Sequence, residues 1–212
     1  MTPVITDIHT HRDDAVQVLI AVSPHNFNPR PGLFYAVGYH PWDDVDKLTD
    51  AHFDLLEQCA RHPQVLAIGE TGMDSLRGAA LDVQRRVYVR HLQLADKLGL
   101  PIIAHCVRTA ADIINARRSA GLGHVSVVIH GMRGNEHVAR MLLDAGCYLS
   151  YGIRFNPRAL AVTPLDRLLI ETDDDDSAIY QVAATVASAI HLSASELMSL
   201  TAATATALLQ CQ

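Results

Sequence analysis

The sequence lacks the features that mark disulfide scaffolds, membrane-spanning chains and proteins with a broad basic surface. Its four cysteines, Cys59, Cys106, Cys147 and Cys211, form no CxxC pair, and no apolar run reaches the ~18 residues of a membrane span. Asp and Glu number 23 against 17 Lys and Arg, so the formal net charge is −6, and no block of basic residues occurs. We therefore expect a cytoplasmic protein with reduced thiols, no export signal and no wide phosphate-neutralising face.

The order of the apolar runs predicts an α/β fold. With 212 residues, 49% of them hydrophobic, the chain can bury a full core, and we expect residues 1–212 to form one domain. Short β-branched runs predict eight strands, at residues 4–9, 17–22, 33–38, 65–69, 101–105, 125–130, 147–151 and 167–171. Amphipathic stretches predict helices at residues 44–61, 80–98, 109–120, 136–145, 177–190 and 193–209. This alternation is typical of a (β/α)8 barrel of the TIM type, whose chemistry lies at the carboxyl ends of its strands.

The first third of the chain departs from this pattern. Only residues 10–16 separate the first two expected strands, and only residues 23–32 the next two. A parallel crossover normally needs about a dozen residues or more, so we expect this third to be abbreviated or irregular. Elsewhere the local signals are regular: Ser193 and Glu196 form a capping-box pattern, and Gly99 predicts the end of the second helix.

The first expected strand carries a possible half of a metal site. Asp7, His9 and His11 alternate along it, so on an extended backbone their side chains share one face. A single His-x-His pair is also compatible with two polar histidines at a strand end. The other strand ends favour the metal site, because a nitrogen or carboxylate ligand follows four of them: Glu70, His105, His130 and Asp173.

Six such ligands converging on one barrel mouth exceed what a single tetrahedral zinc needs. They suit two metal ions bridged by a carboxylate, and Glu70 is the natural bridge. Such a pair lowers the pKa of a bound water and stabilises both oxygens of a displacement, so hydrolysis is the expected chemistry. Imidazole and carboxylate ligands suit Zn, Mn, Fe or Co, and suit Mg less well.

Six motifs in order carry a resemblance to a known family. They are DIHTH at 7–11, VGYHP at 37–41, IGETGMD at 68–74, PIIAHC at 101–106, IHGMRG at 129–134 and LIETD at 169–173. Together they resemble the TatD-like hydrolases of the amidohydrolase superfamily. The resemblance implies a distorted TIM barrel and a metal-dependent enzyme, with deoxyribonucleases that trim DNA from the 3′ end among its relatives.

The resemblance also implies roles for individual residues. It implies that one metal is held by His9, His11, Glu70 and Asp173, and the second by Glu70, His105 and His130. By the same analogy Asp173 orients or deprotonates the attacking water, and Asp7 fixes the orientation of an imidazole.

The chain also differs from the family pattern. It is shorter than the usual member because the helix expected after DIHTH is missing, which predicts a wider mouth on that side. Asp174, Asp175 and Asp176 replace the usual small residue and proline, and they predict a negative rim that repels phosphate unless metals offset it.

Several further residues have two interpretations each. His40 either contacts the substrate or protonates a leaving oxygen, or it caps a loop. Arg108 and Arg133 either bind an anionic group or are solvated. Arg154 and Asn156 have the same alternatives at the next strand. The aromatic residues Trp42, Phe34 and Tyr151 either stack on a base or pack in the core or rim.

Three functions remain open at this stage. A phosphodiesterase acting on DNA ends or short oligonucleotides is the leading hypothesis, without a membrane or an obligatory protein partner. A small-molecule amidohydrolase or phosphoesterase would use the same two-metal site. A metal-binding module without turnover is the third, and the intact ligand set argues against it.

Overall fold

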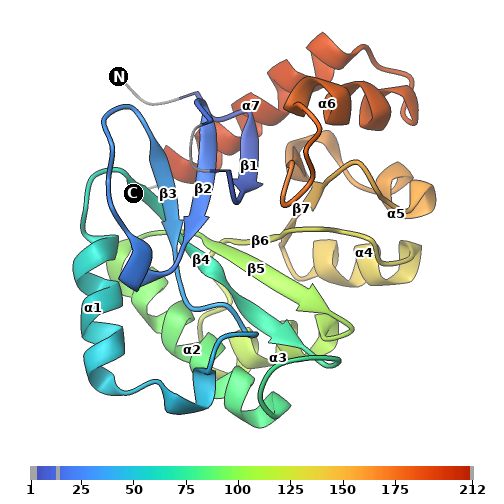
Figure 1. Ribbon diagram of the computed structural model, residues 1–212. Coiled ribbons are helices and arrows are strands. Elements are labelled where there is room, and N and C mark those ends of the chain that lie inside the picture. The colour runs from blue at the N-terminus through green and yellow to red at the C-terminus, as the bar shows by residue number, and fades with distance from the viewer. Residues whose placement is uncertain (1–3, 13–14, 211–212) are drawn as a thin grey trace.

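The computed structural model describes residues 4–12 and 15–210 and contains eight parallel strands (Figure 1). They are β1 (Asp7–Thr10), β2 (Val18–Val22), β3 (Phe34–Val37), β4 (Val65–Asp74), β5 (Ile102–Val107), β6 (Val127–Ile129), β7 (Tyr148–Tyr151) and β8 (Leu168–Ile170). Each strand pairs with the next in chain order, and a bridge between Thr10 and Asp173 joins the two edges. The sheet is therefore a nearly closed barrel, and the predicted fold class is confirmed.

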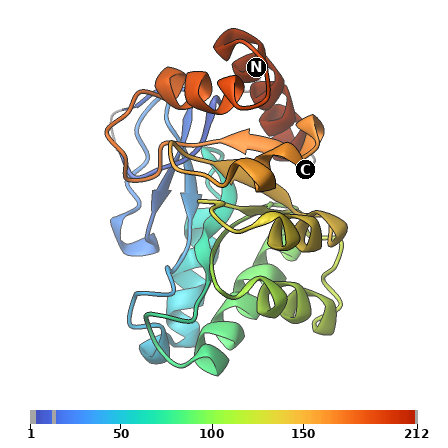
Figure 2. The same cartoon turned by 90° about the vertical axis from the view of Figure 1, so that its right-hand side faces the viewer.

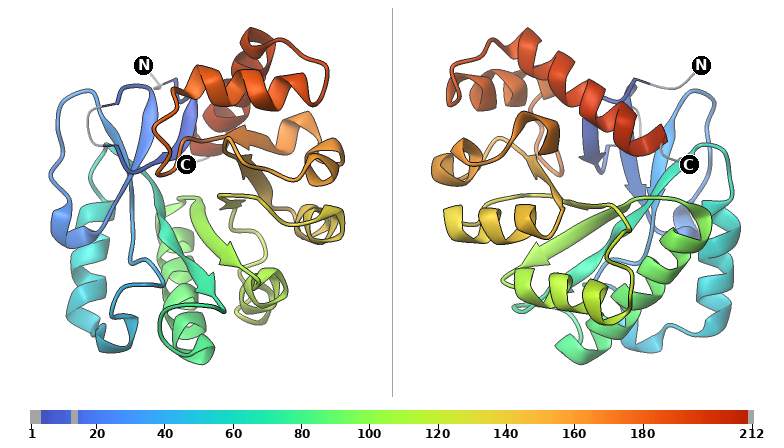
Figure 3. Two further views of the ribbon diagram at one scale, coloured as in Figure 1. Left: turned by 45° about the vertical axis from the view of Figure 1, so that its right-hand side comes forward. Right: turned by 180° about the vertical axis from the view of Figure 1, so that it is seen from behind.

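Helices cover the outside of this barrel (Figure 3, left). They are α1 (Asp50–Ala60), α2 (Leu81–Leu98), α3 (Ala110–Ser119), α4 (Glu136–Asp144), α5 (Pro157–Ala161), α6 (Ile179–Ser188) and α7 (Ala194–Gln210). Figure 2 looks onto the side covered by α4, α5 and α6, whereas α7 crosses the back (Figure 3, right). None of the described helices has the length and apolar character that a membrane crossing requires.

The first third is abbreviated, as expected. Within the described residues, the connection 11–17 holds no helix, and the connection 23–33 holds only the 3-10 turn η1 (Pro24–Asn26). β1 and β2 are nevertheless parallel. They are only four and five residues long, so the distance that the connection must span is short. Phe27 packs edge-on against Tyr35 of β3, with ring centroids 5.3 Å apart.

Alternating strand residues build two layers of core. One cluster lies between the strands and the helices and includes Ile102 and Ala104. The other includes Ile103, which points to the opposite face, and takes residues from β1 to β6, from β8 and from the last turns of α7. This second cluster fills the barrel, so the polar ligands gather above a packed apolar floor.

The structure changes the bounds of three predicted elements and adds a helix. The expected helix 44–61 divides into the 3-10 turn η2 (Val45–Lys47) and α1, because Thr49 caps α1 together with His52. The expected helix 177–190 shortens to α6, and α5 was not predicted. The expected strand 65–69 continues to Asp74, where its end pairs with β5. The capping box of Ser193 with Glu196 and the left-handed Gly99 at the end of α2 are confirmed.

Candidate metal centre

Glu70 lies at the centre of the polar cluster. The pairing of β4 with β5 is irregular between Ile68 and Thr71, and this bulge changes the direction of the Glu70 side chain. Oε2 of Glu70 lies 3.2 Å from Nε2 of His9 and 3.4 Å from Nε2 of His11. Its Oε1 lies 2.7 Å from Nε2 of His130 and 2.9 Å from Nδ1 of His105. Each carboxylate oxygen therefore faces a different pair among these four imidazoles.

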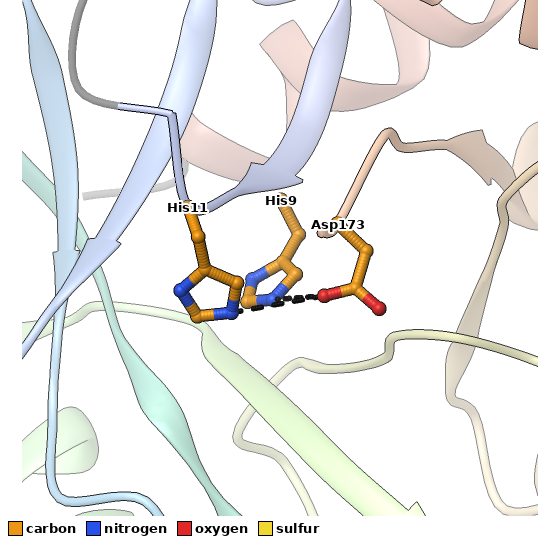
Figure 4. A group of neighbouring side chains, drawn as sticks. All are labelled: His9, His11 and Asp173. Carbon is orange, nitrogen blue, oxygen red and sulfur yellow. Dashed lines mark ion pairs between the residues drawn. The ribbon is translucent and has the colours of Figure 1, made fainter. Parts of the chain in front are cut away.

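At the seam of the barrel, where β1 meets the segment after β8, His9 and His11 lie close to Asp173 (Figure 4). Oδ1 of Asp173 lies 3.5 Å from Nε2 of His9 and 3.7 Å from Nε2 of His11. Backbone hydrogen bonds fix this approach, because Asp173 N–H donates to His9 O and His11 N–H donates to Asp173 O. Asp173 adopts a φ of 55°, a conformation that non-glycine residues rarely take outside constrained sites.

Asp7 also fixes this seam, through its carboxylate. Its Oδ1 accepts the N–H groups of His9 and Thr172, at 3.3 and 3.1 Å, and its Oδ2 accepts the Thr172 hydroxyl at 2.6 Å. The carboxylate thus holds the backbone of His9 and the segment after β8, and no hydrogen bond to an imidazole is recorded for it. Burial raises the pKa of Asp7 to about 6, although these hydrogen bonds oppose the shift.

His105 has its ring orientation set by a carboxylate on its far side. Nε2 of His105 lies 3.2 Å from Oδ2 of Asp74, and the indole N–H of Trp42 donates to the same oxygen at 2.8 Å. A neutral ring that donates through Nε2 keeps its lone pair on Nδ1, the nitrogen that faces Glu70. His105 is therefore prepared to act as a ligand through Nδ1.

His40 is also close to Glu70, but it presents a protonated nitrogen to that carboxylate rather than a lone pair. Its Nε2 lies 2.9 Å from Oε1 of Glu70, within the distance of a ligand cluster with His105. However, the backbone N–H of Trp42 donates to Nδ1 of His40 at 3.1 Å. A neutral ring that accepts at Nδ1 carries its proton on Nε2, so His40 offers the centre a donor rather than a lone pair.

Mutual attraction between carboxylates and imidazoles dominates the electrostatics of the cluster. Burial and His130 oppose the protonation of His9, yet Glu70 and Asp173 outweigh them and raise its pKa to about 9. Burial would raise the pKa of Asp173, but His9 lowers it to about 2. Burial likewise opposes ionisation of Glu70, whose pKa His130 and His9 hold well below its usual value. The site therefore concentrates the negative charge of Glu70 and Asp173, which positive charge must balance.

The donor set fits divalent cations. His9 is completely buried, and neither of its ring nitrogens has a hydrogen bond among the described residues, although two carboxylates lie close by. A buried unpaired nitrogen is costly unless something binds it. Ligand atoms of His9, His11 and Asp173 lie within 4.8 Å of one another, as do those of His9, Glu70 and His130. Imidazole and carboxylate ligands converging in this way suit borderline transition metals.

Two acidic residues at the site were not singled out from the sequence. Asp74 lies four residues beyond Glu70 on β4, and the same-face argument used for His9 and His11 would have found it if the strand had been extended. Glu171 is fully buried, accepts the N–H of Gly131, and places Oε1 3.6 Å from Nδ1 of His130.

The remaining candidates separate into two groups. Arg108, Arg133 and Arg154 are exposed and line one cavity together with Trp42. Asn156 instead caps α5 by accepting the N–H of Arg158. Tyr151 is fully buried and Phe34 packs against the barrel core, so core packing is confirmed for these two aromatic residues.

Comparison with known proteins agrees with this architecture. The family model "TatD related DNase" matches residues 24–210. "Uncharacterized metal-dependent hydrolase YabD" of Bacillus subtilis is 32% identical over 149 residues, which cover 66% of this chain and 58% of that protein. "3'-5' ssDNA/RNA exonuclease TatD" of Cronobacter turicensis is 33% identical over 153 residues, which cover 67% and 57%. The chain thus spans less than three fifths of the length of these relatives.

A solved structure extends the likeness over the whole fold. The TatD homologue YJJV from Escherichia coli K12 superimposes with a TM-score of 0.83, covering 98% of both chains at 22% identity. The TatD family protein from Entamoeba histolytica gives a TM-score of 0.80 at 16% identity and covers both chains completely. With the match over residues 24–210, these findings confirm the resemblance: the chain belongs to the TatD-related DNase family.

Proposed function

We propose that the chain is a divalent-metal-dependent phosphodiesterase that trims single-stranded DNA from its 3′ end. The observation that carries the proposal is the placement of Glu70, whose two oxygens face two separate pairs of imidazoles. A bridging carboxylate of this kind is typical of two-metal hydrolytic sites. The name of the Cronobacter turicensis relative, a 3'-5' ssDNA/RNA exonuclease, supports the choice of substrate.

The proposed ligands form two sets, one for each oxygen of Glu70. One cation would be held by His9, His11, Glu70 and Asp173, and the other by Glu70, His105 and His130. When bound, such cations lower the pKa of water and neutralise the charge on a phosphoryl group. Zn, Mn, Fe and Co suit these ligands better than Mg.

Two residues are placed to act on the attacking and leaving oxygens. Asp173 is ionised at neutral pH because its pKa is about 2, and its Oδ1 faces the imidazoles, which leaves Oδ2 to accept a proton from the attacking water. His40 carries its proton on Nε2 and stabilises the leaving oxygen by donating a hydrogen bond to it. Attack and departure thus use groups from two different strand ends.

Binding of the phosphate backbone is local. The net charge of −6 and the run Asp174 to Asp176 disfavour a long polyanion, so the cations and the guanidinium groups of Arg108 and Arg133 supply most of the attraction. We therefore expect weak, salt-sensitive binding and a preference for short oligonucleotides.

The test is the cleavage of a short 5′-labelled single-stranded DNA by purified protein in Mn²⁺ at low salt. Asp173→Asn is the test variant, and Asp144→Asn, which changes an exposed carboxylate at the end of α4, is the matched control. We expect stepwise shortening by the wild type and the control, and none by Asp173→Asn or after chelation. Bound metal is quantified for every sample.

Failure has two distinguishable forms. If the wild type binds metal and leaves DNA intact but hydrolyses small esters or amides, the protein is a small-molecule hydrolase that uses the same site. If it binds metal and hydrolyses neither class, the metal-binding module without turnover replaces both enzymes.

A further inference from the structure

A cavity of about 820 Å³ opens beside the candidate metal centre. His105, His130 and Asp173 form its polar end. Its other end is apolar and lies between the first turn of α3 and one side of α4, where Ala111 and Met141 contribute to the wall. Ligand sites of ~300–1,000 Å³ enclose whole small molecules, so this cavity has room for much more than a phosphate group.

Three arginines also line the cavity. Arg108, Arg133 and Arg154 are exposed, and their side chains make no hydrogen bond or ion pair with residues 4–12 and 15–210, although Arg154 and Asp175 attract each other. Arg61, Arg86 and Arg140, in contrast, each pair with the carboxylate four residues earlier in the chain. Guanidinium groups without an ion-pair partner beside a metal cluster are suited to the phosphates of a ligand whose remainder fills the apolar end.

The mouth of the cavity is formed by a fixed aromatic ring. Trp42 is 44% exposed, yet its indole N–H is bonded to Asp74, and the guanidinium of Arg77 lies 4.0 Å from its ring centroid. The ring is also edge-on to His105, with centroids 5.2 Å apart. Arg77 covers one face of the ring, so the ring has only its other face to offer as a stacking surface for a base.

We propose that this cavity binds the base of the terminal nucleotide, between Trp42 at the mouth and the apolar wall of α3 and α4. The assignment rests on the proposed phosphodiesterase function and adds to it a defined subsite. A base must leave its partner to enter a cavity bounded by two helices, so an unpaired end is the form that fits. The chemical class recognised is a nucleoside monophosphate unit rather than the sugar-phosphate backbone alone.

Trp42 is the only tryptophan of the chain, so its fluorescence reports on the cavity directly. The experiment titrates the protein in Mn²⁺ with dAMP and, separately, with 2-deoxyribose 5-phosphate, which lacks the base. Ala111→Phe fills the apolar end from an exposed position, and Asn115→Phe places the same ring one turn further along α3, away from the cavity lining. Thermal unfolding confirms that both variants fold.

We expect dAMP to bind at least about fivefold more tightly than the baseless phosphate, the smallest effect typical of one stacked base. Ala111→Phe should remove this difference while leaving the affinity for 2-deoxyribose 5-phosphate within about twofold, and Asn115→Phe should preserve the difference. Equal affinities in the wild type, or a preference for dAMP that survives Ala111→Phe, would overturn the assignment of the cavity.

Hydrolysis of bis(4-nitrophenyl) phosphate by the wild type separates this inference from the proposed function. Hydrolysis without a preference for dAMP refutes the base subsite and leaves the phosphodiesterase intact. A preference for dAMP that Ala111→Phe removes, without hydrolysis of the diester or of DNA, refutes the phosphodiesterase and leaves a nucleotide-binding cavity.

Discussion

Oδ2 of Asp74 lies 3.2 Å from Nε2 of His105, on the side of the ring opposite the nitrogen that faces Glu70. Asp74 is itself fixed, because its backbone N–H donates to the buried Gln84 and its Oδ1 accepts the N–H of Leu76. Asp74→Asn should therefore weaken metal binding by about ten- to a hundredfold, the usual cost of losing a partner behind a ligand. Isothermal titration with Mn²⁺ measures this change.

Asp82→Asn is the control for that experiment, because it removes an exposed carboxylate from α2 without touching the site. Its affinity for Mn²⁺ should equal that of the wild type. An unchanged affinity in Asp74→Asn would show that His105 needs no partner behind it.

The proton on Nε2 of His40 leads to a prediction about leaving groups. His40→Ala should slow the hydrolysis of DNA by about a hundredfold, because the departing alkoxide then loses the hydrogen bond from Nε2–H. Hydrolysis of bis(4-nitrophenyl) phosphate should fall much less, since 4-nitrophenolate departs without a proton. Equal losses for both substrates would instead indicate that His40 positions the substrate.

Gly72 allows β4 to pass close to β5 beside a proposed ligand. A Cβ at this position would clash with the carbonyl oxygen of His105, and the φ of 136° disfavours other residues. Gly72→Ala should therefore cost about 3 kcal/mol or more of unfolding free energy. Gly123→Ala is the control, because nothing lies within 4 Å of its Cβ, and it should change stability by less than about 1 kcal/mol. Urea unfolding measures both.

A buried histidine outside the cluster makes stability depend on pH. His91 on α2 accepts the backbone N–H of Tyr39 at 3.1 Å, and burial lowers its pKa from 6.5 to about 4. The unfolded chain thus binds the proton more readily than the folded chain does. The stabilisation is complete above pH 6.5 and is lost as the pH falls towards 4, by about 3 kcal/mol in total.

His91→Gln keeps an acceptor for Tyr39 and does not titrate in this range. The loss of stability between pH 7 and pH 4, measured by urea unfolding, should be smaller in His91→Gln than in the wild type. Identical pH profiles for the two proteins would exclude His91 as the source.

The sequence predicts the strands and the composition of the cluster well because both depend on short-range patterns. Parallel strands all end on the same side of a barrel, so His105 and His130, each following a β-branched run, had to lie near Glu70. Alternation on an extended strand likewise placed His9 and His11 on one face. These arguments need no knowledge of distances.

The features that the sequence did not predict depend on three-dimensional contacts. Gly69 and Gly72 resemble a strand end in the sequence, yet close approach to β5 lets β4 continue through both and present Asp74. The proton position on His40 follows from a hydrogen bond with Trp42 that forms only when the loop after β3 is folded. The division of the expected helix 44–61 depends on the reciprocal cap between Thr49 and His52.

The seam of the barrel has a mechanical consequence. β1 and the segment after β8 meet through one bridge, and the proposed ligands His9, His11 and Asp173 lie on both sides of that junction. A cation held there would link the two sides of the junction and oppose opening of the barrel. Loading with Mn²⁺ should accordingly slow amide hydrogen exchange along the seam more than in the extensively paired β4 and β5, so the ion that serves the chemistry would also complete the closure of the fold.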